Sequence, residues 1–262
     1  MKVVMINDCA YVSQTLAQQM RKTGINVELR LRTRSFFDKT LGIAGKVITS
    51  KGDIYHCAYL LNDCWLARKF MKRPLLGHAH GSDIRGINGK WGKIIKKNLM
   101  SCDKILVATP DIYNVAKEFN NTTEYFPTPI DIELFSPVND MKIDRKRALY
   151  CLKYFDSFPV DLGKEILNRG YEIIVMKPGS FNYKEMPNIY RKYDLFIDQQ
   201  TLPIITKMCL EAMSCGIPVV THDGRFRMNG DMNRKFVIEN HDSKKLSKRL
   251  IDIYRTLVNV DI

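Results

Sequence analysis

The sequence predicts an α/β fold built on parallel sheets, and three observations support this. Short runs rich in β-branched and other apolar residues recur at Lys2–Ile6, Asp53–Tyr59 and Asp103–Thr109. The first and last of these runs show little alternation, which is typical of strands covered on both faces. Segments with apolar residues at helical spacing separate the runs, as in repeated strand–helix–strand units.

The first such unit can be followed residue by residue. The strand Lys2–Ile6 leads through a loop to Ser13, a suitable N-cap for a helix that Gly24 ends, and Ile25–Leu31 returns as a strand. The same alternation continues along the chain, so a doubly covered parallel sheet is expected. Further helices are predicted over Phe36–Ile48, Asp63–Phe70, Pro110–Phe119, Asp161–Asn168 and Ser243–Val258, and further strands over Arg73–His80, Thr123–Phe126, Ala148–Leu152 and Tyr171–Met176.

Composition narrows the class of protein. A length of 262 residues suits one large or two small domains. No apolar run approaches the roughly 18 residues of a membrane span, and Met1–Ile6 is too short for a signal peptide, so a cytoplasmic location is expected. The seven cysteines are odd in number and lack zinc spacing, which favours free thiols. The net charge of +13 attracts polyanions such as nucleic acid, anionic lipid or phosphorylated substrates.

The most informative stretch is Ile204–Thr221. Its middle, Thr206 to Ser214, has the apolar spacing of a helix, which Gly216 and Pro218 end before a short buried strand. One carboxylate, Glu211, lies inside this otherwise apolar helix. It is either a solvated surface residue or a side chain turned into a cleft to bind hydroxyl groups.

The segment L-E-A-M-S-C-G-I-P-V-V, which contains Glu211, resembles the C-terminal signature of retaining GT-B glycosyltransferases of the family 4 type. A second segment, Pro127–Pro137, resembles the stretch between the two domains of that family. The resemblance implies two Rossmann-like domains with parallel sheets facing a cleft. We expect an N-terminal domain over residues 1–137 and a C-terminal donor domain over residues 138–262, with the final helix able to pack back on the first domain.

The resemblance also implies a site for a nucleotide-diphosphate sugar, with UDP or GDP as the nucleotide. Glu211 would hold the ribose hydroxyls, and the helix that starts near Thr206 would face the diphosphate. Lys153 and Lys207 would add positive charge, so that no metal or other cofactor is needed. The family usually has another Glu eight positions before Glu211, and Pro203 stands there in this chain.

The acceptor side is expected at His80-Gly81-Ser82-Asp83, which resembles a strand-end histidine followed by Gly-Ser-Asp in the family. His80 would contact the sugar, and His56 on the preceding strand would lie close to the cleft. Alternation places His78 and His80 on one face of their strand. A third metal ligand is not evident beside them, so no metal site is expected. The alternative to a functional role is that each histidine is satisfied by neighbouring backbone.

A basic segment follows from Arg85 to Lys97. Lys93, Lys96 and Lys97 share one helical face, and apolar residues with Trp91 lie opposite. Such a segment either lies on an anionic membrane surface or presents an ordinary solvated lysine face. Membrane contact would suit a lipid-linked acceptor.

The sequence therefore predicts a retaining, metal-independent glycosyltransferase that acts on a lipid-linked or glycan acceptor. The main alternative is a GT-B-like protein without transferase activity, which binds a nucleotide or serves as a partner subunit; Pro203 favours it. A nucleic-acid-binding protein is a third possibility that only the charge supports, since no recognition motif is visible, and no nucleic acid is expected as a partner.

Overall fold

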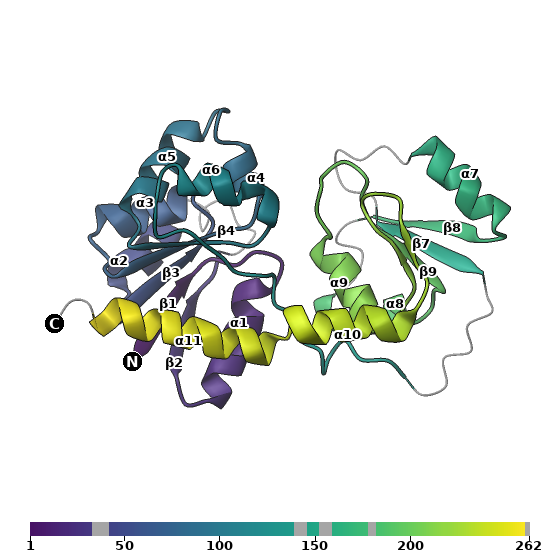
Figure 1. The fold of residues 1–262 in the computed structure, drawn as a ribbon. Coiled ribbons are helices and arrows are strands. Elements are labelled where there is room, and N and C mark those ends of the chain that lie inside the picture. Colours follow the sequence, from purple (N-terminus) through teal and green to yellow (C-terminus); the bar gives the residue numbers. More distant parts are fainter. Residues whose placement is uncertain (33–41, 139–145, 152–158, 178–181, 260–262) are drawn as a thin grey trace. The chain divides into compact units, whose positions relative to one another are not determined.

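The computed structural model describes residues 1–32, 42–138, 146–151, 159–177 and 182–259, and it divides into two compact units (Figure 1). Unit 1 comprises Met1–Pro129 and Ser243–Ile262, and unit 2 comprises Ile130–Asp242. The chain thus enters unit 2 once and returns with its last helix to unit 1, as the sequence allowed. The division falls after Pro129, earlier than the predicted boundary at residue 138. The reason is that Ile130 pairs with Asp242 and Phe135 is buried in the core of unit 2.

Unit 1 is built on a six-stranded parallel sheet with the order β2-β1-β3-β4-β5-β6. From β1, the chain adds β2 on one side of the sheet and β3 to β6 on the other. The strand order therefore changes direction between β1 and β3, and the carboxyl ends of these two strands flank a topological switch point. Its strands are β1 Lys2–Ile6, β2 Asn26–Arg30, β3 Ile54–Ala58, β4 Leu75–Ala79, β5 Lys104–Val107 and β6 Glu124–Tyr125.

Helices cover both faces of this sheet, and successive strand residues supply the two cores. Val4 and Ile6 point into one core, whereas Val3 and Met5 point into the other. The first face is covered by α2 Ile43–Thr49, α3 Asn62–Lys69, α5 Gly92–Ser101 and α6 Tyr113–Lys117. The second face is covered by α1 Val12–Lys22 and α11 Ser243–Asn259, which pack against each other (Figure 1).

Unit 2 has a five-stranded sheet with the order β11-β10-β9-β7-β8, in which only the β10–β11 pair is antiparallel. Its strands are β7 Arg147–Cys151, β8 Glu172–Met176, β9 Leu195–Ile197, β10 Val219–Val220 and β11 Phe226–Arg227. Its helices are α7 Val160–Asn168, α8 Met186–Tyr190, α9 Lys207–Ser214 and α10 Gly230–Asn240. Both units are therefore Rossmann-like, which confirms the predicted α/β class.

Two local differences from the sequence expectations have physical reasons. The basic segment from Arg85 to Lys97 is not one helix, because α4 Ser82–Arg85 ends at Gly86 and α5 begins at Gly92. Only the second half of the predicted helix Phe36–Ile48 can be compared with the structure, where it forms α2. The first half falls on residues 33–41, which lie outside the described residues. No helix among the described residues is both long and apolar enough to cross a membrane.

Candidate functional site

The predicted signature helix forms as expected at the carboxyl end of β9. Helix α9 spans Lys207–Ser214 with Thr206 as N-cap, and its Cys209 N–H donates to the Thr206 hydroxyl. Gly216 adopts φ +77° just beyond the helix, which a side chain would disfavour. The helix start therefore lies where ligands bind in open α/β sheets.

Glu211 is buried and faces a polar network within unit 2. Only 3% of the residue is exposed, so the solvated surface position that the sequence allowed is excluded. Its Oε2 accepts a hydrogen bond from the Tyr190 hydroxyl at 2.9 Å, and its Oε1 forms an ion pair with Lys207 Nζ. Lys207 Nζ also donates to the Tyr183 hydroxyl at 2.9 Å. Each carboxylate oxygen of Glu211 thus has a partner from the protein itself.

The network fixes the charges of its members. Burial lowers the pKa of Lys207, but the charge of Glu211 and the hydrogen bonds with Glu211 and Tyr183 outweigh this and leave the pKa above its usual value. Burial and the charge of Glu211 raise the pKa of Tyr190 well above its usual value. Lys207 therefore remains a cation and Tyr190 a hydroxyl donor. The sequence placed Lys207 against the donor phosphates, whereas the structure directs its ammonium group to Glu211.

The amino end of α9 already meets a carboxylate. Asp198, 2% exposed, accepts from the Thr206 N–H at 2.9 Å and from the Thr206 hydroxyl at 2.6 Å. A carboxylate is stabilised at this position by the unpaired N–H groups of the helix. The single hydroxyl hydrogen of Thr206 is consequently used by Asp198. The role of Thr206 as a phosphate donor stays a prediction that requires this cap to open.

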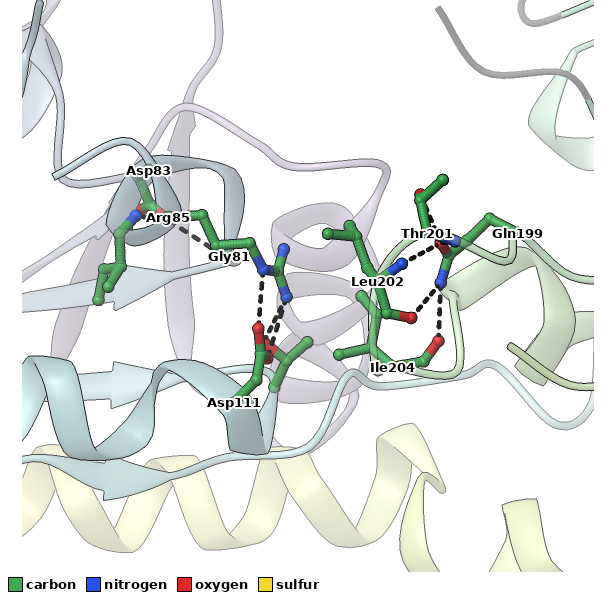
Figure 2. A network of polar contacts seen from close by, with 10 residues as sticks. Gly81, Asp83, Arg85, Asp111, Gln199, Thr201, Leu202 and Ile204 are labelled. Atoms are coloured by element: carbon green, nitrogen blue, oxygen red, sulfur yellow. Dashed lines mark hydrogen bonds and ion pairs between the residues drawn. The ribbon is translucent and has the colours of Figure 1, made fainter. Parts of the chain in front are cut away.

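The loop between β9 and α9 is held by one side chain, as the right part of Figure 2 shows. Gln199 Nε2 donates to the carbonyl oxygens of Leu202 at 2.7 Å and Ile204 at 3.1 Å. Gln199 Oε1 accepts from the N–H groups of Thr201 at 2.8 Å and Leu202 at 2.7 Å. Pro203, which replaces the family glutamate, lies exposed inside this loop. Lys153, the other predicted phosphate contact, lies outside the described residues.

In unit 1, three histidines lie in a row across the carboxyl half of β3 and β4. His56 Nε2 and His78 Nδ1 are 3.2 Å apart, and the ring centroids of His78 and His80 are 4.2 Å apart. His56 Nδ1 also forms a hydrogen bond with the hydroxyl of Tyr254 on α11. The predicted common face of His78 and His80 is confirmed. We call His56, His78 and His80 the histidine row.

Burial keeps the whole histidine row neutral. It lowers the pKa of His56 and of His80 to about 3, and it lowers the pKa of His78 well below the usual value. His80 remains partly exposed as a residue, although its Nε2 is buried. These histidines are therefore uncharged at neutral pH.

The residues after His80 form a tight turn, shown on the left of Figure 2. Gly81 has φ +106°, and a Cβ there would lie 2.3 Å from a guanidinium nitrogen of Arg85. Asp83 is buried and accepts from the N–H groups of Gly81 at 3.1 Å and Leu60 at 3.2 Å, so it braces the turn. Ser82 is exposed beside it.

The basic segment is split between two environments. Arg85 forms an ion pair with Asp111, so its charge is neutralised locally. Lys93 and Lys97 are exposed on α5, and Trp91 is 44% exposed with Lys90 Nζ 5.5 Å from its ring centroid. The cationic and aromatic surface is therefore smaller than the sequence suggested and is centred on the start of α5.

The sequence did not predict the residues that form hydrogen bonds with Thr206, Glu211 and His56. Asp198, Tyr190 and Tyr254 lie on other elements than the groups they contact. Only Asp198 had a local signal, because an acid at the end of a buried strand faces the ligand edge of a sheet. Among the described residues, no group of three or more His, Cys, Asp or Glu side chains is arranged to hold a metal ion.

No family profile matches the sequence, and no curated protein matches it by sequence. Solved structures do match over nearly the whole chain. Sucrose-phosphate synthase from Thermosynechococcus elongatus gives a TM-score of 0.71 at 13% identity, covering 99% of this chain and 100% of that one.

Two further structures extend the likeness. HepE of Anabaena, solved in complex with UDP-glucose, gives a TM-score of 0.66 at 12% identity, covering 98% of this chain and 100% of that one. UDP-N-acetylglucosamine 2-epimerase from Rickettsia bellii gives 0.54 at 12% identity, covering 99% of this chain and 97% of that one. The chain therefore has the GT-B fold of glycosyltransferases, as the sequence predicted, and at these identities the likeness establishes the fold alone.

Proposed function

We propose that this protein is a glycosyltransferase that moves a sugar from a nucleotide-diphosphate sugar to a hydroxyl group of a glycan or lipid-linked acceptor. The observation that supports it best is the position of Glu211. A buried carboxylate lies on the helix that starts at the carboxyl end of β9, in a GT-B fold. Two of the proteins with this fold are named with a UDP-sugar, which favours a donor of that class.

The chemistry proposed for this site needs no metal. Lys207 is a buried cation beside Glu211, and it would neutralise part of the charge that develops on the departing nucleotide diphosphate. Glu211 would exchange its contact with Tyr190 or Lys207 for the ribose hydroxyls, since a carboxylate has lone pairs for about four hydrogen bonds. His80, neutral and partly exposed, would contact the sugar. Retention of the anomeric configuration belongs to the same proposal.

A second candidate is a nucleotide-binding protein of this fold without transferase activity. Pro203 favours it, because the loop around this residue is closed on Gln199 and presents no carboxylate to a sugar. The two candidates differ in whether the sugar bond is cleaved.

The experiment is a thermal-shift series with UDP, GDP and ADP, followed by assay of hydrolysis of the matching nucleotide sugar. Both candidates predict stabilisation by one nucleotide, and only the transferase predicts hydrolysis. Glu211→Gln should weaken nucleotide binding by about 1–3 kcal/mol because the ribose hydroxyls lose a charged acceptor. Glu165→Gln, which alters an exposed i,i+4 ion pair on α7, is the matched control. Equal affinities in the two variants would remove Glu211 from the site.

A lipid-linked acceptor would bring the protein to an anionic membrane surface, and the start of α5 supports this part of the proposal. Trp91 and the exposed lysines Lys93 and Lys97 combine an aromatic anchor with positive charge. Sedimentation with phosphatidylserine vesicles tests it, with phosphatidylcholine vesicles as control. Equal sedimentation with both kinds of vesicle, or none with either, would contradict binding to an anionic membrane surface. A soluble glycan would then be the acceptor that the proposal retains.

A further inference from the structure

The histidine row is joined to the last helix by a continuous line of hydrogen bonds. The Tyr254 hydroxyl on α11 bonds to His56 Nδ1 on β3, and His56 Nε2 bonds to His78 Nδ1 on β4 at 3.2 Å. Tyr254 is fully buried, and His56 and His78 are each 1% exposed. We call Tyr254, His56 and His78 the relay. It runs from one covering helix into two neighbouring strands of unit 1.

The relay has a preferred direction. If Tyr254 donates its single hydrogen to His56 Nδ1, then His56 has its proton on Nε2 and donates to His78, which then has its own proton on Nε2. In the opposite direction the Tyr254 hydrogen would have no acceptor among the described residues, and His78 Nε2 would also be unpaired. The first direction leaves one unsatisfied buried group and the second leaves two, and each such group is unfavourable.

The relay ends against His80. His78 Nε2 and His80 Nε2 are both buried without a hydrogen-bond partner in the described chain, and the two rings stack with centroids 4.2 Å apart. Buried N–H groups without an acceptor are rarer in proteins than buried acceptors without a donor, so the buried Nε2 of His80 favours a lone pair. His80 Nδ1 is not among the buried unpaired atoms, and it belongs to a partly exposed residue. The proton of His80 is therefore favoured on Nδ1.

We propose that Tyr254, His56 and His78 are positioning residues that fix the ring of His80, whose proton lies on Nδ1, so that His80 meets the sugar as a hydrogen-bond donor. The tautomers follow from unit 1 alone, whereas the contact with the sugar rests on the proposed transferase activity. The ligand group that His80 recognises is then an oxygen that accepts a hydrogen bond. The final helix returns to unit 1 in part to supply the hydroxyl that sets this direction.

The first test measures the tautomers directly. Long-range proton–nitrogen NMR spectra of the full-length protein should show His56 and His78 with protons on Nε2 and His80 with its proton on Nδ1. Tyr254→Phe removes only the hydroxyl group and should let His56 and His78 exchange between both tautomers. A proton on Nδ1 of His56 or His78, or on Nε2 of His80, would overturn the proposal, whether or not the protein turns over a sugar donor.

The second test separates positioning from mere stability, with UDP-glucose as the donor probe. Tyr254→Phe should lower kcat about fivefold, the worth of one neutral hydrogen bond, with KM for UDP-glucose unchanged. Ser247→Ala removes another buried hydroxyl on α11, one that bonds within the helix, and should leave kcat and all three tautomers unchanged. Equal kcat in the two variants, or fixed tautomers in Tyr254→Phe, would show that the hydroxyl only stabilises the fold. Absence of turnover by the unmodified protein would count against the proposed transferase activity. The NMR measurement of the tautomers would still test the proposed relay in that case.

Discussion

Acidification from pH 7 to pH 5 should destabilise unit 1, because the histidine row is neutral in the folded state. The pKa values of His56 and His80 are lowered to about 3, against about 6.5 in an unfolded chain. Between these two values the unfolded chain binds more protons than the folded one, so stability falls as the pH falls. This stability is fully present above pH 6.5 and is lost progressively toward pH 3.

The size of the effect follows from the same values. At pH 5 each of these two histidines disfavours folding by about 2 kcal/mol relative to pH 7, and the pair by about 4 kcal/mol. His78 adds to this in the same direction. Burial raises the pKa of Asp63 and of Asp83, which acts in the opposite direction because the folded state then holds the extra protons. Against a typical total of about 5–15 kcal/mol, the loss is large.

Urea unfolding followed by tryptophan fluorescence isolates the effect, since both tryptophans, Trp65 and Trp91, lie in unit 1. His80→Asn should reduce the loss of unfolding free energy between pH 7 and pH 5 by about 2 kcal/mol. His222→Asn is the control, because it lies in unit 2, which holds neither tryptophan, and it should leave the fluorescence signal of this loss unchanged. The carboxyl contributions are common to all three proteins and cancel in the comparison. An unmodified protein that is equally stable at both pH values, or a loss that His80→Asn does not reduce, would refute the assignment of a neutral, buried row.

Two further substitutions test the packing of each site. Lys207→Met should destabilise unit 2 by about 3–5 kcal/mol by leaving Glu211 buried without its cation, and the added change Glu211→Leu should restore most of the lost stability. Urea unfolding followed by circular dichroism measures the free energy of unfolding of each variant. A loss as small as that caused by Lys235→Met, which removes an exposed ion pair, would contradict the burial of the Lys207–Glu211 pair. Gly81→Ala should destabilise unit 1 by about 1–3 kcal/mol, because a Cβ at φ +106° lies 2.3 Å from a guanidinium nitrogen. Gly45→Ala on α2 meets open space and should be stabilising by about 0.5–1 kcal/mol, so equal melting temperatures in the two alanine variants would contradict the geometry of the turn.

The fold was predictable because its signals are local. Buried strands without alternation, glycines after helices and the period of the helices fix each element within its own segment. The common face of His78 and His80 followed in the same way from the period of a strand, and their ring contact bears it out. The amphipathic face of α11 followed from its own spacing, whereas its return to unit 1 was expected only from the resemblance to GT-B proteins.

The chemistry of the sites was less predictable because it depends on distant partners. Tyr254 meets His56 across 198 positions of sequence, and no spacing rule connects a tyrosine on a final helix with a histidine on the third strand. The boundary between the units was misplaced for a related reason. The resemblance of Pro127–Pro137 to an inter-domain stretch put the boundary after Pro137, but the pairing of Ile130 with Asp242 decides where unit 2 begins.

The signature around Glu211 shows why a sequence match and a functional site are separate statements. Cys209, Leu210, Ala212 and Met213 are buried in the core of unit 2, and a Cβ on Gly230 would lie 2.0 Å from the Gly216 carbonyl oxygen. Most of the motif therefore serves the packing of unit 2 in this chain. Glu211 differs from these neighbours, because a buried ion pair contributes little net stability compared with apolar side chains of similar volume. Packing alone does not require a carboxylate at this position, which agrees with the proposal that Glu211 binds the hydroxyl groups of a ligand.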